Sequence, residues 1–181
     1  MRQDLVSRAQ RGDEAAFGEL ATSLVDRLFA VAFRILRDSD TSNDATQEAL
    51  VKIWRELPAL RDTDRFDAWS YRILVNACYA EIRRVRRPPP MTLPMPVEAY
   101  DPLGAIVDRE QLERGFDRLP AEQRAALVLQ HYLDLSLSDI ADVMGVPVGT
   151  VRSRLHYARE SMRAALEADL RAAPARPGAT A

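Results

Sequence analysis

The residues best suited to bind a ligand in this sequence are arginines, and they gather in two separate segments. Residues 65–87 hold six arginines against two acidic residues, and residues 147–163 hold four arginines against one glutamate. The whole chain carries a net charge of −2, so the two clusters are local features rather than a general excess of positive charge. Such segments indicate two contacts with a polyanion. For either segment taken alone, a solvated helix face is the alternative.

The sequence gives little support for disulfide bonds, a metal site or an enzymatic active site. The single cysteine, Cys78, excludes a disulfide framework within the chain and a cysteine-cluster zinc site, and two histidines are too few for a histidine-rich metal site. There is no glycine-rich phosphate loop and no nucleophile elbow. We therefore expect no enzymatic activity, no metal and no cofactor. A charged N-terminus and the lack of a membrane-length apolar run predict a cytoplasmic protein that does not insert into a membrane.

The segment 136–162 has the layout of a helix-turn-helix. Ser136 followed by Asp139 is typical of a capped helix start, and Gly145 suits the positive φ of a tight turn. Pro147 fits the first turn of the second helix, where a missing N–H costs nothing. The second helix then carries an apolar stripe formed by Val151, Leu155, Ala158 and Met162.

The opposite face of this second helix suits the major groove of DNA. Arginine pairs bidentately with guanine, serine and histidine bond base edges or phosphates, and backbone amides at a helix start can take a phosphate. The predicted DNA-contacting residues are Gly149, Thr150, Arg152, Ser153, Arg154, His156, Tyr157 and Arg159. His131 stands on an otherwise apolar helix, so we expect it to be partly buried and hydrogen-bonded instead.

A second candidate DNA contact lies on a long helix expected from about Phe66 to Arg87. Its polar, cationic face repeats every three or four residues and consists of Arg72, Asn76, Tyr79, Arg83 and Arg86. Arginines neutralise phosphates, and an aromatic or amide side chain can hold a base rotated out of the stack. Trp54 and Trp69 are interpreted as core residues. For Phe66, next to the preceding loop, core packing and base contact both remain open.

The pattern of apolar residues predicts an all-α chain made of two small helical domains. Residues three or four apart between Phe17 and Ile35 predict one long buried helix, which the polar stretch 38–45 should end before another helix at about 44–57. Six of the eleven prolines fall between Pro88 and Pro102, which predicts a flexible proline-rich linker. The expected domains are 1–87 and 108–171, with a linker at 88–107 and a disordered tail at 172–181.

Five stretches of the chain resemble a known family. "GVPVGTVRSRLHYARE", preceded by "LPAEQRAALVLQHYLDLSLSDIA", resembles the promoter-binding region 4 domain of extracytoplasmic-function (group 4) sigma factors of bacterial RNA polymerase. "GDEAAFGELATSLVDRLFAVAFRIL", "DATQEALVKIW" and "RFDAWSYRILVNACYAEIRR" resemble the region 2 domain of that family in order and spacing. The resemblance covers about residues 3–165.

The resemblance implies a sigma factor that binds core RNA polymerase and directs promoter-specific transcription initiation. The second domain would recognise the −35 element of promoter DNA through the helix-turn-helix. The first domain would recognise and melt the −10 element through Phe66, Arg72, Asn76, Tyr79, Arg83, Arg84 and Arg86. The residues implied for docking on core RNA polymerase are Asp44, Gln47, Glu48 and Arg55. An anti-sigma factor is the partner implied for regulation.

A free helix-turn-helix regulator with an N-terminal sensing domain is the alternative function. It explains the second domain equally well, but it does not explain the basic and aromatic helix of the first domain. Some positions also depart from the family pattern. Ala45 and Thr46 replace large aliphatic residues, Ala80 stands where aspartate is common, and Val75 stands where a basic residue is common. These departures leave the fold prediction intact and leave the individual −10 contacts open.

Overall fold

The structure, a computed structural model, describes residues 2–85 and 109–172. Arg86, the expected linker 88–107 and the end of the expected tail lie outside the described residues. Within those two ranges every regular element is helical, which confirms the all-α prediction, and no helix there is long and apolar enough to cross a membrane. The elements are α1 (Arg2–Gln10), α2 (Glu14–Leu36), α3 (Ser39–Glu56), the 3₁₀ turns Leu57–Ala59 and Thr63–Arg65, α4 (Phe66–Val85), α5 (Arg109–Asp117), α6 (Ala121–His131), α7 (Leu137–Met144) and α8 (Val148–Ala172).

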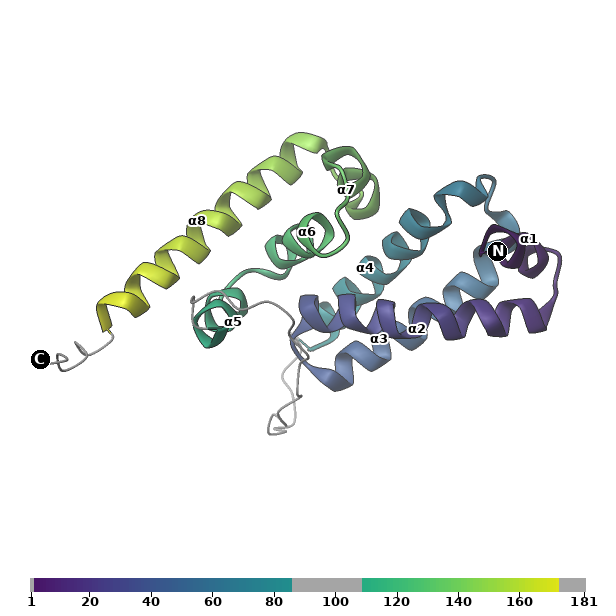
Figure 1. Cartoon of the computed structure of the whole chain (residues 1–181), viewed down its shortest axis with the longest axis horizontal. Coiled ribbons are helices and arrows are strands. Elements are labelled where there is room, and N and C mark those ends of the chain that lie inside the picture. Colours follow the sequence, from purple (N-terminus) through teal and green to yellow (C-terminus); the bar gives the residue numbers. More distant parts are fainter. Residues whose placement is uncertain (1, 86–108, 173–181) are drawn as a thin grey trace, which may run out of the picture.

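The first domain is a bundle in which α2, α3 and α4 pack against one another and α1 packs on α2 (Figure 1). Its centre consists of large aliphatic side chains with no exposed surface, among them Leu20, Leu28, Ile35, Ile53 and Leu74. Asp13 caps α2 as expected, because its Oδ1 accepts a hydrogen bond from the Ala16 amide at 3.0 Å. This apolar centre fixes how the surfaces of α3 and α4 are presented.

The expected break between the two helices is present but shorter than predicted, because α2 ends at Leu36 and α3 begins at Ser39 rather than near Asp44. Asp38 caps the helix by accepting a hydrogen bond from the Thr41 amide at 2.8 Å. The polar side chains that follow are compatible with a helix because their hydroxyls bond back to it. Thr46 is buried, and its Oγ1 donates to the Ser42 carbonyl at 2.7 Å. A helix cap therefore stands where the polar composition indicated a loop.

The second domain contains the expected helix-turn-helix in α7 and α8. The Ser136 hydroxyl accepts from the Asp139 amide at 3.2 Å, and Gly145 adopts the left-handed conformation with φ 65°. The Pro147 carbonyl accepts from the Thr150 amide at 2.9 Å as α8 begins. Leu129, Ile140 and Leu155 form the buried centre. The predicted caps and turn of this motif are confirmed.

Cys78 lies fully buried in α4, and burial raises the pKa of its thiol to about 12. The thiolate is the reactive form, so the folded protein should alkylate far more slowly than the unfolded chain at neutral pH. Labelling by a thiol reagent, followed by mass spectrometry with and without denaturant, measures the difference. Equally fast labelling in both conditions would contradict the burial.

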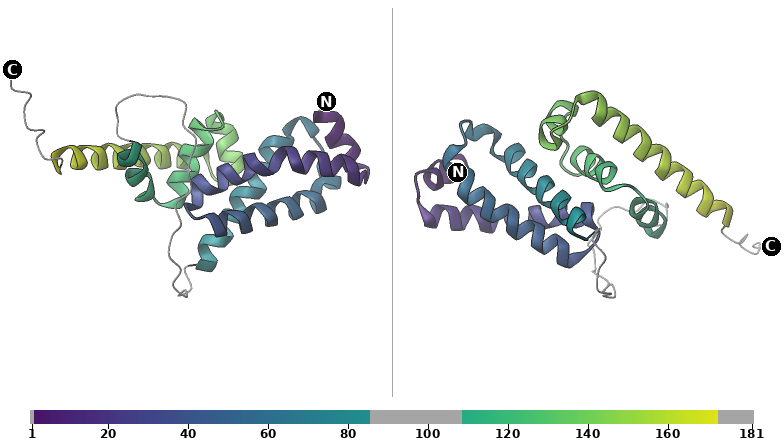
Figure 2. Two further views of the ribbon diagram at one scale, coloured as in Figure 1. Left: turned by 60° about the horizontal axis from the view of Figure 1, so that its bottom comes forward. Right: turned by 180° about the vertical axis from the view of Figure 1, so that it is seen from behind.

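The two domains pack directly on each other. α2 packs on α6, and α4 packs on α7. Figures 1 and 2 show α6 and α7 lying between the first domain and α8, and the C-terminal half of α8 extends beyond the first domain. This packing of the second domain on the first determines which of the predicted DNA-contacting residues are exposed to solvent.

Candidate nucleic-acid interface

The start of α8 presents a polar and aromatic face to solvent. Val151, Leu155 and Ala158 are buried against the rest of the second domain, and this orients the opposite face outward. The exposed residues on that face are Gly149, Arg152, Ser153, His156 and Tyr157. Tyr157 is 60% exposed, and its ring centroid lies 5.5 Å from that of His156. We name these five residues the α8 face.

Three residues predicted for the same contact lie apart from the α8 face. Thr150 is half-buried in the first turn. Arg154 is half-buried and acts electrostatically on the Tyr79 hydroxyl of the first domain. Arg159 is exposed, but its Nη2 donates to Gln130 Oε1 on α6 at 2.6 Å. Of the three arginines predicted to contact the −35 element, Arg152 is therefore the one that lies on the α8 face.

The predicted −10 residues of α4 divide into an accessible group and a covered group. Arg72, Asn76 and Arg83 are exposed. Tyr79 is half-buried, and burial raises the pKa of its hydroxyl. Phe66 is only 3% exposed, with its ring centroid 5.9 Å from that of Trp69. In this arrangement Phe66 is a core residue, and it would have to leave the core to contact a base.

Arg84, predicted to contact DNA, instead joins α4 to α3. Its Nη2 lies 2.8 Å from Asp44 Oδ2 and 2.7 Å from Glu81 Oε2. The hydrogen bond to Asp44 and the charge of Glu81 raise the pKa of Arg84. Because two carboxylates already neutralise this guanidinium, it is a poorer phosphate ligand than Arg83, which is exposed on the same helix. Arg86 lies outside the described residues.

The residues predicted to dock on polymerase form one exposed surface of α3. Asp44, Gln47, Glu48 and Arg55 are all exposed, while Ala45, Ala49 and Ile53 on the other side are buried. Val51 lies at the centre of the same surface and is 49% exposed, which is unusual for a large apolar side chain. The sequence analysis missed Val51, although the spacing 44, 47, 48, 51 and 55 follows one helix face. We name these five residues the α3 surface.

Two hollows flank α4. One, of about 280 Å³, lies between α3 and α4 and includes Glu48, Asn76 and Arg83 in its lining. The other, of about 430 Å³, lies between the 60–65 loop and α4 and includes Trp69 and Arg72. Asp142 of α7 also lines the second hollow, so the second domain reaches the candidate −10 site.

A third and larger hollow of about 620 Å³ lies where α2, α5, α6 and α8 meet. Its lining is largely apolar and includes Leu112, Phe116 and Met162. His131 lines this hollow and is exposed, so the prediction that it would be partly buried was wrong. The last turn of α6 lies at the surface rather than in the core.

Trp54 is packed as expected, half-buried with its ring centroid 4.5 Å from that of Phe17.

Comparison with known proteins identifies the class of protein. Residues 20–88 match the family described as Sigma-70 region 2, and residues 109–162 match the family described as Sigma-70, region 4. The chain is 37% identical over 186 residues to the RNA polymerase sigma-H factor of Pseudomonas aeruginosa, covering 94% of this chain and 96% of the relative. It is 33% identical over 175 residues to the ECF RNA polymerase sigma-E factor of Escherichia coli K12, covering 88% and 91%.

Solved structures share the fold. CnrH in complex with the cytosolic domain of CnrY matches with a TM-score of 0.66 at 25% identity, covering 92% of this chain and 97% of that one. The sigma factor RpoE of Bartonella quintana, in complex with the anti-sigma factor NepR, shares the fold with a TM-score of 0.67 at 24% identity, covering 84% and 98%. The chain belongs to the extracytoplasmic-function sigma factors of bacterial RNA polymerase.

Membership of this family gives the function in outline. The protein binds core RNA polymerase and directs promoter-specific transcription initiation, recognising −10 and −35 elements. The alternative of a free helix-turn-helix regulator is not favoured, because polymerase subunits match almost the whole chain. The residue assignments and the domain boundaries stay predictions.

Proposed function

We propose that the α8 face recognises the −35 element, that α4 recognises and opens the −10 element, and that the α3 surface docks on core polymerase. The observation that carries this division is that the α8 face and the α3 surface are both solvent-exposed, each on a helix whose opposite side is buried. Arg72, Asn76 and Arg83 supply the accessible part of the −10 contact. No step of this function requires an active site, and we propose that the protein acts in the cytoplasm as a non-enzymatic factor.

The composition of the α3 surface suits a protein partner better than DNA. An apolar residue, Val51, is surrounded by Asp44, Glu48, Gln47 and Arg55, which is the arrangement of an apolar centre and a polar rim. The Glu48 carboxylate would repel a phosphate backbone, and the Asp44 carboxylate already holds Arg84. We therefore assign this surface to polymerase docking and α4 to the nucleic acid.

We propose an anti-sigma factor as the regulatory partner. One similar solved structure, CnrH, is a complex with the cytosolic domain of CnrY, and another, RpoE, is a complex with the anti-sigma factor NepR. In this chain the hollow of about 620 Å³ is apolar inside and carries Arg34, His131 and Arg163 in its lining. An amphipathic helix with acidic edges would complement such a groove.

Run-off transcription with purified core polymerase tests the proposed function. The wild-type chain should give promoter-dependent transcripts. Val51→Glu places a charge at the centre of the α3 surface, so it should abolish the transcripts while changing the affinity for a −35 duplex by less than about twofold. Val25→Glu, on α2, is the matched control, because Val25 is 36% exposed and lies outside the α3 surface.

Two outcomes would contradict these assignments. Normal transcription by Val51→Glu would remove the α3 surface from polymerase docking. A wild-type chain that binds DNA by itself but never initiates with core polymerase would restore the regulator alternative.

A further inference from the structure

The loop that lines the candidate −10 site has little regular structure of its own. It contains the 3₁₀ turns Leu57–Ala59 and Thr63–Arg65, and residues 60–62 between them belong to neither turn. These three residues nevertheless line the hollow of about 430 Å³ together with Trp69 and Arg72 of α4. One wall of this hollow is therefore made of irregular backbone, and its position depends on what holds it from outside.

α1 holds this loop through the side chain of Gln10, the last residue of the helix. The Gln10 Nε2 donates to the Leu57 carbonyl at 3.2 Å and to the Leu60 carbonyl at 2.7 Å. An amide nitrogen carries two hydrogens, so one side chain can satisfy both carbonyls. Leu57 is fully buried and Gln10 is half-buried, so the two bonds are partly shielded from water. Gln10 therefore fixes the point at which the chain leaves the first 3₁₀ turn and enters the wall of the hollow.

A second glutamine of α1 holds the other end of the loop. Gln3 Nε2 donates to Asp64 Oδ1 at 2.6 Å, and the Asp64 amide donates to Asp62 Oδ1 at 3.0 Å. Gln3 and Gln10 are separated by about two helical turns, so they lie on the same face of α1. Val6, between them, is 1% exposed and anchors this face in the core. α1 thus contacts the loop near both of its ends.

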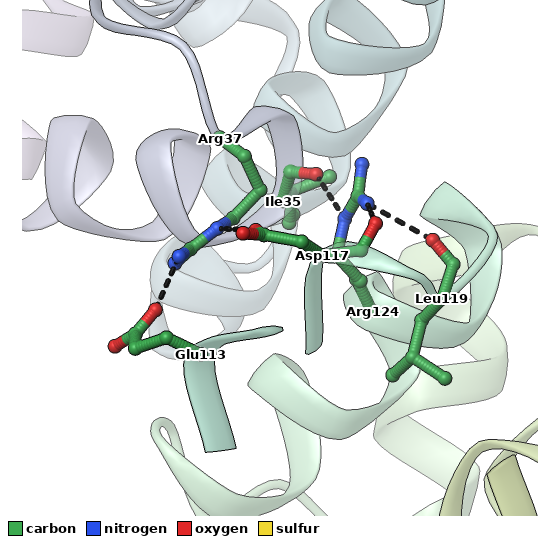
Figure 3. Close-up of polar contacts among 6 residues, drawn as sticks. All are labelled: Ile35, Arg37, Glu113, Asp117, Leu119 and Arg124. Carbon is green, nitrogen blue, oxygen red and sulfur yellow. Dashed lines mark hydrogen bonds and ion pairs between the residues drawn. The ribbon is translucent and has the colours of Figure 1, made fainter. Parts of the chain in front are cut away.

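The polar contacts that join the two domains at the end of α2 lie far from this loop. There Arg37 pairs with Glu113 and Asp117, and Arg124 donates to the Ile35 carbonyl at 2.7 Å (Figure 3). α1 lies beside the opposite end of α2 (Figure 1). The 23 residues of α2 span about 34 Å from one end to the other. These contacts therefore do not determine where the loop at residues 60–65 lies.

One contact from the second domain does reach the loop. Arg65 Nη2 lies 2.7 Å from Asp142 Oδ2, and both side chains are more than half exposed. An exposed ion pair contributes little to stability and is screened by salt. The bonds of Gln10 come from the same domain as the loop and are partly buried. We therefore assign the larger share of the positioning to Gln10.

We infer that Gln10 is a positioning residue for −10 recognition, because it holds residues 60–62 in the place where the loop and α4 together receive the −10 element. The inference rests on the proposed −10 role of α4. Gln10 contacts no DNA in this proposal and acts through the loop alone. A loop held in one place rejects a wrong sequence because it cannot adapt to it, whereas a released loop can rearrange around several. A held loop also loses less conformational freedom when DNA binds.

Gln10→Glu is the decisive variant. Glutamate has nearly the same shape, but its carboxylate accepts hydrogen bonds and cannot donate them, so it would face two carbonyls without a proton to share. Two hydrogen bonds are lost, so the holoenzyme should lose about five- to tenfold in discrimination between a cognate promoter and one with a substituted −10 element. Discrimination at the −35 element should stay within about twofold of wild type, because the loop lies outside the α8 face.

Two measurements separate positioning from a general effect on the fold. Competition between promoters bound by the holoenzyme gives the discrimination at the −10 and at the −35 element. Hydrogen–deuterium exchange of the free protein follows the loop directly. The amides of residues 60–65 should exchange faster in Gln10→Glu, while the amides of α8 should exchange as in wild type. A residue that served only stability would lower both discriminations together and speed exchange across the whole first domain.

Arg11→Gln is the matched control. It changes the net charge by the same amount one residue away, and Arg11 is exposed in the turn after α1. It should keep the wild-type discrimination at the −10 element. Gln10→Lys is the rescue variant, because an ammonium group can again donate to both carbonyls. Its added charge strengthens binding to both promoters alike, so the discrimination should return to within about twofold of wild type.

Gln10→Ala removes both donors without adding a charge, and it replaces Gln10→Glu in the test if that variant does not fold. The inference is overturned if the variants keep wild-type −10 discrimination, if they lower −10 and −35 discrimination equally, or if exchange at residues 60–65 is unchanged. It is also overturned if both variants unfold, since Gln10 would then serve the fold. Run-off transcription keeps the two proposals distinguishable: a wild-type chain that initiates with core polymerase retains its sigma function whatever the Gln10 variants do.

Discussion

Replacing Arg152 with alanine should reduce discrimination at the −35 element by about 1–3 kcal/mol, which is roughly 5- to 150-fold. Arg152 is exposed on the α8 face, next to Ser153, whose hydroxyl donates to the Gly149 carbonyl at 3.1 Å. A guanidinium placed this way can bond two acceptors of a guanine in the major groove. Competition between a cognate promoter and one with a substituted −35 element, each bound by the holoenzyme, measures the change.

Arg163→Ala is the control for this substitution. It removes the same charge from the same helix, but Arg163 pairs with Glu160 at 2.5 Å and lies about three turns beyond Arg152, outside the α8 face. Discrimination should therefore be unchanged. If Arg152→Ala weakens binding equally to both promoters, Arg152 contacts a phosphate rather than a base.

Arg83→Ala and Arg84→Ala should have different effects, although the two residues are adjacent. Arg83 is exposed and available to a phosphate, so its loss should reduce the salt dependence of promoter binding by about 0.7–0.9 in the log–log slope. Arg84 is bound to Asp44 and Glu81, so its loss should leave the slope nearly unchanged. Affinities of the holoenzyme over a series of salt concentrations give both slopes.

Each outcome of this comparison is informative. A slope reduced equally by both substitutions would mean that Arg84 leaves its carboxylates to bind DNA. A slope reduced by neither would remove Arg83 from the phosphate contacts. Retained polymerase binding by Arg83→Ala controls for damage to the neighbouring α3 surface.

The sequence predicted the helix-turn-helix well because the signals that define it are local. Ser136, Gly145 and Pro147 each act on backbone within a few residues, through a cap, a left-handed turn and a helix start. The apolar stripe of α8 then determines which residues remain exposed. The α8 face follows from that stripe.

The sequence could not predict the partners or burial of side chains whose contacts depend on residues far away in the chain. Arg84 belongs to a basic segment, yet its partner Asp44 lies forty residues earlier. Arg154 and Phe66 have the residue types of a DNA contact, and only the packing of helices reveals that they are partly or fully buried. The start of α3 was missed for a local reason, since Asp38 can act equally well as a loop residue and as a helix cap.

The α3 surface is exposed although α4 packs on α7, and this has a consequence for the order of assembly. A polymerase that docks on the α3 surface, as we propose, can bind while α7 still packs on α4, so encounter with the enzyme can precede encounter with single-stranded DNA. If core polymerase binds more tightly to a form in which α7 has left α4, it raises the affinity for the −10 strand by the same factor by which that strand raises the affinity for polymerase. Such reciprocity would make the free protein a poor competitor for single-stranded DNA elsewhere in the genome, and would confine strand capture to the holoenzyme.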